Sequence, residues 1–490
     1  MTTTDVTAVD AVEVAASEPL SDVSRKVGRS AAVLVVRRIV VTAASALSTV
    51  ILARRLSISD FGAYSAGLAT YYLLLSACDL GFNAVLVREL AIRPSGHASW
   101  LRITTQLALI WSLVIGGALL VIGLAAGPGG LRGQTMLALS PALALTGMTV
   151  TRQVFMATYD VRRIAMIDMV ANIAQSAGLC LVALAGFPTA LLAVWIAVTT
   201  IADTLVIARM AVREVPRSPG DRANHRLILR MALPLGLTSI LASAYFMVDI
   251  SIDGFLVRPA ALAGYAAAVK VLTILLSLPG LVMGVALPGL SRQTSDPSTL
   301  SELTARVWHW FATTLLPLTI GMLVFAPIVM GVIFGPAYAH AVGLLRILLA
   351  SGVIALLSNV VGNVLVAQRR AAVMLVQNSV ALGLNVIGNV LLVPRVGVIA
   401  SAWLTLGTEA LVCGASLAWL MGRLRFRPLA AATVRPALAL VPIAAAGWLL
   451  GTGSWLAVAV GTVAFLLVLS LLGAWPADAP LPRRLTADAA

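Results

Sequence analysis

Several charged side chains lie inside long apolar stretches of this sequence, where a charge is costly and therefore marks a candidate site. The cationic members could hold an anionic group such as a diphosphate, and they are Arg38, Lys270 and Arg346. The acidic members could carry a coupling proton or Na⁺, and they are Asp79, Asp249 and Glu409. Ion-driven transport of an anion needs both kinds of charge, but mutual ion pairing would explain the same residues.

Polar residues accompany these charges at helical spacing. One stripe is Tyr72, Ser76, Asp79 and Asn83, and another is Asn378, Asn385 and Asn389. Such stripes could line a wet cavity, in which Asn378 and Asn385 would form hydrogen bonds with sugars. They could equally join neighbouring helices, since polar hydrogen bonds between membrane helices contribute about 0.6 kcal/mol each.

Position alone suggests a second interpretation for some charges. Arg37 and Arg38 lie near the predicted inner end of the first membrane span, so their side chains could reach the membrane surface instead of a cavity. Asp168 and Asp203 lie near span ends, and we expect them to be structural.

The elements that position these residues must be membrane helices. Of the 490 residues, 60% are hydrophobic and only 11% are charged, whereas a soluble domain carries about 25% charged residues. This composition excludes a soluble enzyme, a nucleic-acid-binding protein and a secreted disulfide scaffold. The three cysteines lie in three different apolar stretches, and we expect them to pack as small hydrophobic residues.

The apolar stretches are long enough to cross a bilayer as helices, which takes about 20 residues each. There are fourteen, at 31–52, 63–87, 103–126, 134–156, 164–186, 188–208, 228–250, 262–287, 306–328, 341–366, 371–393, 396–420, 431–450 and 453–473. Strands of a membrane barrel would be about ten residues long with strict alternation. We therefore predict an all-α polytopic membrane protein with fourteen transmembrane helices.

The distribution of basic residues tests the number of spans. With the N-terminus in the cytoplasm, 25 of the 34 Arg and Lys residues fall in inner segments or within four residues of the inner end of a span, five fall in outer segments and four lie deeper within spans. One span more or fewer would invert the later loops and remove this bias. The bias predicts a plasma-membrane protein with both termini in the cytoplasm. It also accounts for the net charge of +14 without a nucleic-acid partner.

Composition divides the chain into five parts. Residues 1–24 lack the basic start of a signal peptide and are predicted to be a disordered cytoplasmic tail. Residues 25–208 form a first lobe of six spans, and residues 228–420 form a second lobe of six. A basic cytoplasmic linker at 209–227 separates the lobes, and residues 421–490 hold the last two spans and a cytoplasmic tail.

Motifs of other function classes are absent from the sequence. It contains no nucleotide-binding GxxxxGK(S/T) loop, no HExxH motif and no nucleophile elbow, and its four histidines are scattered. We expect no enzyme, and no cofactor beyond a coupling H⁺ or Na⁺. The alternative class is a non-transporting scaffold or a polymerase partner. Charges on several spans disfavour a pure scaffold, and no external loop is large enough for a polymerase.

Three stretches carry a recognisable combination of motifs. Residues 53–91 contain ARRLSISDFGAYSAG and DLGFNAVLVRELA. Residues 232–292 contain ALPLGLTSILASAYFMVDISIDGFLV, AGYAAAVKVL and LPGLSR. Residues 333–405 contain IFGPAYAHAVGLLRIL, LVAQRR and NVIGNVLLVPRVGVIASAWLT. Their order and spacing over most of residues 25–420 resemble the polysaccharide-exporter branch of the multidrug/oligosaccharidyl-lipid/polysaccharide (MOP) flippase superfamily.

This resemblance implies two six-helix lobes around a central cavity, followed by two further helices, with alternating access as the lobes rock. For Wzx-type members it implies the transfer of a polyprenyl-diphosphate-linked oligosaccharide from the inner to the outer leaflet. Lys270 matches a basic position after the family's Gly-Tyr element, and Asp249 matches an acidic position in the seventh span. The implied partners are this lipid-linked saccharide, membrane lipids, a polysaccharide polymerase and glycosyltransferases.

Two alternatives within the superfamily stay open. MurJ-like flippases of the peptidoglycan precursor also have fourteen spans, but the first lobe here lacks the dense arginine set expected of them. A cation-coupled multidrug antiporter would have an aromatic, acidic cavity, and aromatic residues are only 6% of this chain.

Overall fold

The computed structural model describes residues 20–92, 97–157, 161–215, 224–292, 296–421, 423 and 425–475. These residues fold into helices that form two compact units, one up to Gly254 and one from Phe255 onward. Parts of three predicted segments lie outside the described residues: 1–19 of the N-terminal tail, 216–223 of the linker and 476–490 of the C-terminal tail. The predicted lobe boundaries themselves stay a prediction.

Eleven helical segments in the described part of the chain are long and apolar enough to cross a membrane, as expected of an all-α multi-pass membrane protein. Two of them, Ile58–Ile92 and Arg427–Leu450, each consist of two consecutive α-helices. The three other predicted spans do not meet this criterion in the described residues, each for a different reason. Span 134–156 is divided by a 3₁₀ segment, and the helix within 453–473 has only 17 residues. The helix that contains 228–250 includes side chains outside the described set. The total of fourteen spans therefore stays a prediction.

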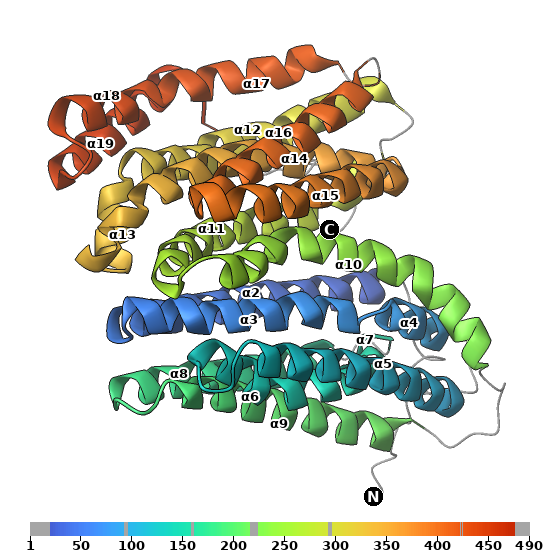
Figure 1. Cartoon of the computed structure of the whole chain (residues 1–490). Helices are drawn as coiled ribbons and strands as arrows, with labels where there is room; N and C mark the ends of the chain where they lie inside the picture. The colour runs from blue at the N-terminus through green and yellow to red at the C-terminus, as the bar shows by residue number, and fades with distance from the viewer. Residues whose placement is uncertain are drawn as a thin grey trace, which may run out of the picture. The chain divides into compact units, whose positions relative to one another are not determined.

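The long helices of the first unit lie side by side (Figure 1). α6 packs against α3, α5 and α9, and α2 pairs with α8. The bounds are α2 Leu20–Arg55, α3 Ile58–Cys78, α4 Phe82–Ile92, α5 His97–Ala125, α6 Leu131–Leu145, η1 Thr146–Arg152, α7 Gln153–Ala157, α8 Val161–Leu184, α9 Ala190–Glu214 and α10 His225–Leu256. α2 begins inside the segment predicted as a tail, at Leu20.

Two helices of the first unit break where the sequence predicts continuous spans. The predicted span 63–87 divides into α3 and α4, because Gly81 adopts a left-handed φ of 86° that only glycine takes without strain. The predicted span 134–156 divides into α6, the 3₁₀ segment η1 and α7. A 3₁₀ stretch in mid-helix often marks a functional hinge or a sequence under strain. Both breaks lie next to polar residues.

The second unit begins with two long helices and ends with three shorter ones. Its bounds are α11 Pro259–Arg292, α12 Pro297–Val324, α13 Ala326–Ile333, η2 Pro336–Ala341, α14 Val342–Ala367, α15 Ala371–Val396, α16 Ile399–Leu420, α17 Phe426–Ala439, α18 Val441–Leu450 and α19 Trp455–Leu471. At the start of α12, the Asp296 carboxylate accepts hydrogen bonds from the Ser298 and Thr299 hydroxyls. These bonds lower the pKa of Asp296 to about 2.

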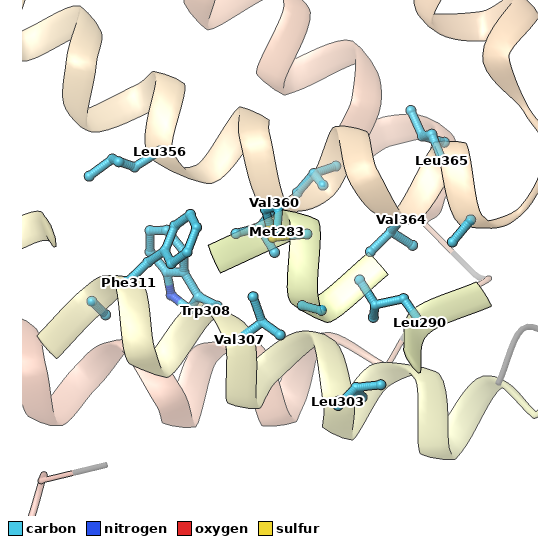
Figure 2. Close-up of a cluster of buried hydrophobic side chains, with 14 of the residues drawn as sticks. Met283, Leu290, Leu303, Val307, Trp308, Phe311, Leu356, Val360, Val364 and Leu365 are labelled. Carbon is cyan, nitrogen blue, oxygen red and sulfur yellow. The ribbon is translucent and has the colours of Figure 1, made fainter. Parts of the chain in front are cut away.

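α11, α12 and α14 enclose the core of the second unit, which Figure 2 shows. Trp308 and Phe311 of α12 pack with Met283 of α11 and with Leu356 and Val360 of α14. All five side chains are at most 5% exposed. A buried aromatic or large aliphatic side chain contributes about 1.5–3 kcal/mol to folding in water. In a bilayer, close packing replaces this term as the main attraction between helices.

The last helices attach to α12. The Trp308 indole N–H donates to the Thr433 hydroxyl at 2.8 Å. The His309 ring nitrogens lie 3.2 Å from the Ala432 carbonyl and 3.0 Å from the Ala474 carbonyl. α18 and α19 nevertheless expose large apolar side chains, including Trp448 at 84% exposure, as expected of helices that face lipid. The predicted span 431–450 is also not continuous, since it divides between α17 and α18.

Candidate functional site

The break between α3 and α4 places Asp79 directly after the end of α3, three residues before α4 begins at Phe82. Its carboxylate oxygen Oδ1 accepts a hydrogen bond from the backbone N–H of Asn83 at 3.3 Å, so Asp79 caps a helix end whose N–H groups lack partners within the helix. The Asn83 side-chain oxygen accepts a hydrogen bond from Gln153 Nε2 at 3.0 Å. The two helix breaks of this unit therefore meet through a polar contact, because Gln153 directly follows η1.

A cavity of about 190 Å³ lies beside this contact. Its polar lining residues are Asp79, Asn83, Thr146 and Thr149. A water molecule takes up about 30 Å³ of the liquid, and ligand pockets measure about 300–1,000 Å³. The cavity therefore has room for a small ion with a few waters, but it is too small for a disaccharide. Carboxylate, amide and hydroxyl oxygens are the ligands that hard cations prefer.

α10 packs against the break between α3 and α4. A Cβ atom added to Gly236 would lie 2.1 Å from the carbonyl carbon of Leu80, and one added to Gly81 would lie 2.3 Å from the Ala232 oxygen. Real Cβ atoms do not approach that closely, so both glycines are required for this packing. Further along α10, the Ser251 hydroxyl lies 3.1 Å from the Thr70 hydroxyl.

A second polar group in the first unit is a network of four charges from α2, η1, α8 and α9. Arg152 donates to Asp168 at 2.7 Å and also forms an ion pair with Asp203. Arg37 forms an ion pair with the other oxygen of Asp168, at 2.7 Å. The Asp168 side chain is 6% exposed and that of Asp203 13%. Two positive and two negative charges balance, which fits the structural role predicted for Asp168 and Asp203.

Two predicted site residues of the first unit do not enter these groups through a described contact. Arg38 is exposed on α2, while its neighbour Arg37 forms the ion pair with Asp168. Asp249 is 6% exposed on α10, and its carboxylate accepts a hydrogen bond from the Ile250 backbone N–H at 2.8 Å. Asp253, one turn further along and fully buried, was not among the predicted site residues.

The predicted cationic residues of the second unit lie at different levels of their helices. Lys270 is half-buried on α11, eight residues into the predicted span 262–287. Arg346 is half-buried in the second turn of α14, and it donates a long hydrogen bond of 3.4 Å to the Thr452 hydroxyl in the turn between α18 and α19. Arg346 therefore also fastens that turn to α14.

The predicted polar residues of the second unit lie on α15 and α16. Asn385 is 2% exposed and accepts a hydrogen bond from Asn389 Nδ2 at 2.6 Å, so this pair is engaged within its own helix. Asn378 is half-buried on the same helix, beside Gln377, whose side-chain oxygen accepts a hydrogen bond from Ser416 of α16. Glu409 is 8% exposed on α16. Binding roles for these residues stay predictions.

The sequence reasoning missed Gln153 and the central position of Arg152. Arg152 lies near the inner end of the predicted span 134–156 and was not singled out, whereas the structure places its guanidinium between Asp168 and Asp203. The break at Asp79 had a local signal, an Asp followed two residues later by Gly, which is typical of a helix start after a turn. The described residues contain no group of three or more His, Cys, Asp or Glu side chains that could hold a metal ion.

Comparison with known proteins places the chain among membrane transporters. The sequence model of the polysaccharide biosynthesis protein family matches residues 27–294, and that of the MatE family matches residues 234–391. No curated protein sequence matches the chain significantly.

Solved structures share the fold at low sequence identity. The lipid II flippase MurJ in an inward closed conformation matches with a TM-score of 0.69 and 13% identity, over 90% of this chain and 98% of that one. A multidrug resistance MATE family transporter of the MOP superfamily, in an inward-facing conformation, matches with a TM-score of 0.58 and 13% identity, over 82% and 98%. A MOP superfamily transporter from Pyrococcus furiosus matches with 0.51 and 15% identity, over 80% and 95%.

Proposed function

Because this chain belongs to the polysaccharide biosynthesis protein family of the MOP transporter superfamily, we propose that it is a flippase for a polyprenyl-diphosphate-linked oligosaccharide. It moves this lipid from the inner to the outer leaflet of the plasma membrane for cell-surface polysaccharide synthesis. The observation that carries the proposal is the family match over residues 27–294, more than half of the chain. A polysaccharide polymerase and glycosyltransferases are the expected partners in that pathway.

The physical task is to carry a diphosphate and its sugars past about 30 Å of hydrocarbon. In this proposal Lys270, Arg346 and Arg38 neutralise the diphosphate, and Asn378 and Asn385 form hydrogen bonds with the sugars. The half-buried position of Lys270 within an apolar helix supports its role, because an ionisable residue there is costly without a function. The prenyl tail stays in lipid, beside the apolar faces of α18 and α19.

A coupling H⁺ or Na⁺ would bind to a carboxylate, and the candidates are Asp79, Asp249 and Glu409. The observation that favours Asp79 is the 190 Å³ cavity with oxygen ligands beside it. The cavity also lies between two helix breaks. Broken membrane helices commonly line ion sites, since their free backbone groups and end dipoles face the cavity.

The described contacts support the predicted order of fourteen spans, in which inner and outer segments alternate. Each joins segments that this topology places on the same side of the membrane. Arg132 donates to the Gly254 carbonyl, and both residues are predicted to be outer. Arg163 and Glu214 are likewise both inner. Arg346, near the outer end of its predicted span, contacts the outer Thr452, and His309, near the inner end of its span, contacts the inner Ala474.

Depletion of the protein in its native host tests this function. Membrane extracts are assayed for polyprenyl-diphosphate-linked saccharides, and an impermeant sugar-modifying reagent assigns each saccharide to a leaflet. The proposal predicts that an inward-facing, lipid-linked intermediate accumulates and that re-expression clears it. Accumulation of the peptidoglycan precursor instead would indicate that the protein is a MurJ-like flippase with that precursor as its substrate. No accumulation, with greater sensitivity to cationic drugs, would favour an antiporter.

A further inference from the structure

A basic pocket of about 680 Å³ opens where α11, α14 and α16 of the second unit end. We call it the arginine pocket, and its polar and aromatic lining residues are Ser291, Gln368, Arg369, Arg370, Trp419 and Arg423. Its volume is within the range of ligand pockets, about 300–1,000 Å³. None of the residues described as lining it is acidic. It shares no residue with the sites discussed above.

The arginines of the pocket are gathered around one indole ring. The guanidinium carbon of Arg423 lies 4.1 Å from the centre of the Trp419 ring, and that of Arg370 lies 5.6 Å from it. Arg423 also donates a hydrogen bond to the Trp419 carbonyl. Stacking on an aromatic ring leaves the edge of a guanidinium, with its N–H donors, available to an oxyanion.

The third arginine is held by an unusual backbone conformation. Arg369 is the only non-glycine residue with a positive φ in the described part of the chain, at 59°. The turn is fixed by hydrogen bonds from the Arg369 N–H to the Val366 carbonyl and from the Arg370 N–H to the Leu365 carbonyl, each 2.9 Å long. The turn therefore presents two consecutive arginines to one pocket.

Three positive charges at one pocket repel one another, and an anion between them removes that repulsion. Arginine matches phosphate in particular, because its planar fork can donate two parallel hydrogen bonds to phosphate oxygens. We propose that the arginine pocket binds a phosphate group carried by a lipid of the inner leaflet. The proposal does not depend on which lipid the protein translocates.

Two observations favour a lipid as the source of the phosphate. The predicted topology places all the lining segments at the inner membrane surface, where anionic lipids create a negative potential and basic pockets between helices bind their headgroups. The pocket also combines a tryptophan, typical of the membrane–water boundary, with the apolar Val366 and Ala367. A lipid can place its phosphate on the arginines while its glycerol region contacts this apolar wall.

Native mass spectrometry of the purified full-length protein in detergent tests the proposal. Phosphatidylglycerol and phosphatidylcholine are titrated into the wild type, into Arg370→Ala/Arg423→Ala, and into Arg427→Ala as the control. Arg427 is an exposed arginine on nearby α17 that does not line the pocket. We expect phosphatidylglycerol to bind more tightly than phosphatidylcholine to the wild type and the control, and to bind the double variant on the order of tenfold or more weakly.

Two further arms make the outcome decisive. Arg370→Lys/Arg423→Lys keeps the charges and loses the planar forks, so its affinity for phosphatidylglycerol should lie between those of the wild type and the alanine variant. Excess inorganic pyrophosphate should not displace the lipid completely, because the lipid retains its apolar contacts. Equal lipid binding by the wild type and the alanine variant would overturn the proposal. Tight binding of pyrophosphate with no preference for phosphatidylglycerol would overturn the assignment to a lipid.

Discussion

Replacement of Arg152 by Met tests whether the four-charge network holds the first unit together. The Arg152 guanidinium forms ion pairs with Asp168 and Asp203, and Met has a similar length but neither charge nor donors. Asp168 keeps its pair with Arg37 at 2.7 Å. The variant therefore leaves one carboxylate, that of Asp203, without the cation it faces and gives the network a net charge of −1.

The expected cost follows from the burial of these groups. Removal of one partner of a fully buried ion pair costs about 3–5 kcal/mol, because the other charge stays buried and uncompensated. The Arg152 side chain is 25% exposed and that of Asp203 13%, so water screens part of this cost and we expect about 2–3 kcal/mol. For a unit of this size that corresponds to a fall of about 5–10 °C in melting temperature.

The assay is thermal unfolding of the purified protein in detergent, followed by tryptophan fluorescence. Arg163→Met is the matched control, because Arg163 forms an exposed ion pair with Glu214 that is worth at most about 1 kcal/mol. Arg152→Met/Asp203→Asn restores the charge balance, and its melting temperature should recover at least half of the loss. A single variant as stable as the wild type, or a double variant as unstable as the single one, would refute the reasoning.

The remaining predictions concern Gly236 on α10, Asp79 beside the cavity of about 190 Å³, and Lys270 on α11. Gly236→Ala should lower the melting temperature and the transport rate, because the added Cβ would collide with the Leu80 carbonyl. The control is Gly117→Ala in α5, which should leave both unchanged, because a Cβ added there would have no atom within 4 Å. Asp79→Asn should keep the fold, since Asn caps helices as well as Asp. It should abolish the dependence of transport on an ion gradient, and an unchanged dependence would reduce Asp79 to a capping role. Lys270→Ala should abolish export at a normal membrane level of the protein, and Lys270→Arg should retain part of it; normal export by Lys270→Ala would remove this residue from the diphosphate site.

The positions of the helices were predictable because hydropathy reports on membrane insertion. Eleven of the apolar stretches are helices of sufficient length and apolarity in the described part of the chain. Hydropathy does not report on helix breaks, since the residues of a broken helix are as apolar as those of a continuous one. The 3₁₀ segment from Thr146 to Arg152 thus gave no signal, and the break at Asp79–Gly81 gave only the local signal of its cap and glycine.

The partners of the intramembrane charges were not predictable from one sequence. Asp168 and Asp203 are 35 residues apart, and their common partner Arg152 comes from a third element, so only tertiary packing brings them together. The same holds for the arginine pocket, whose residues were interpreted as ordinary inner-loop charges. That interpretation explains their side of the membrane but not their arrangement around Trp419.

The most direct test of the proposed function is translocation by the purified protein in lipid vesicles. A fluorescent polyprenyl-diphosphate-linked oligosaccharide is placed in both leaflets, and an impermeant quencher is added outside, with and without a proton or Na⁺ gradient. We predict that the wild type moves the inner-leaflet lipid to the outer leaflet, where the quencher reaches it. In vesicles that contain Lys270→Ala, the inner-leaflet lipid should stay unquenched, as in vesicles without protein. Protection of the inner-leaflet lipid by the wild type under every gradient would contradict the assignment as a flippase.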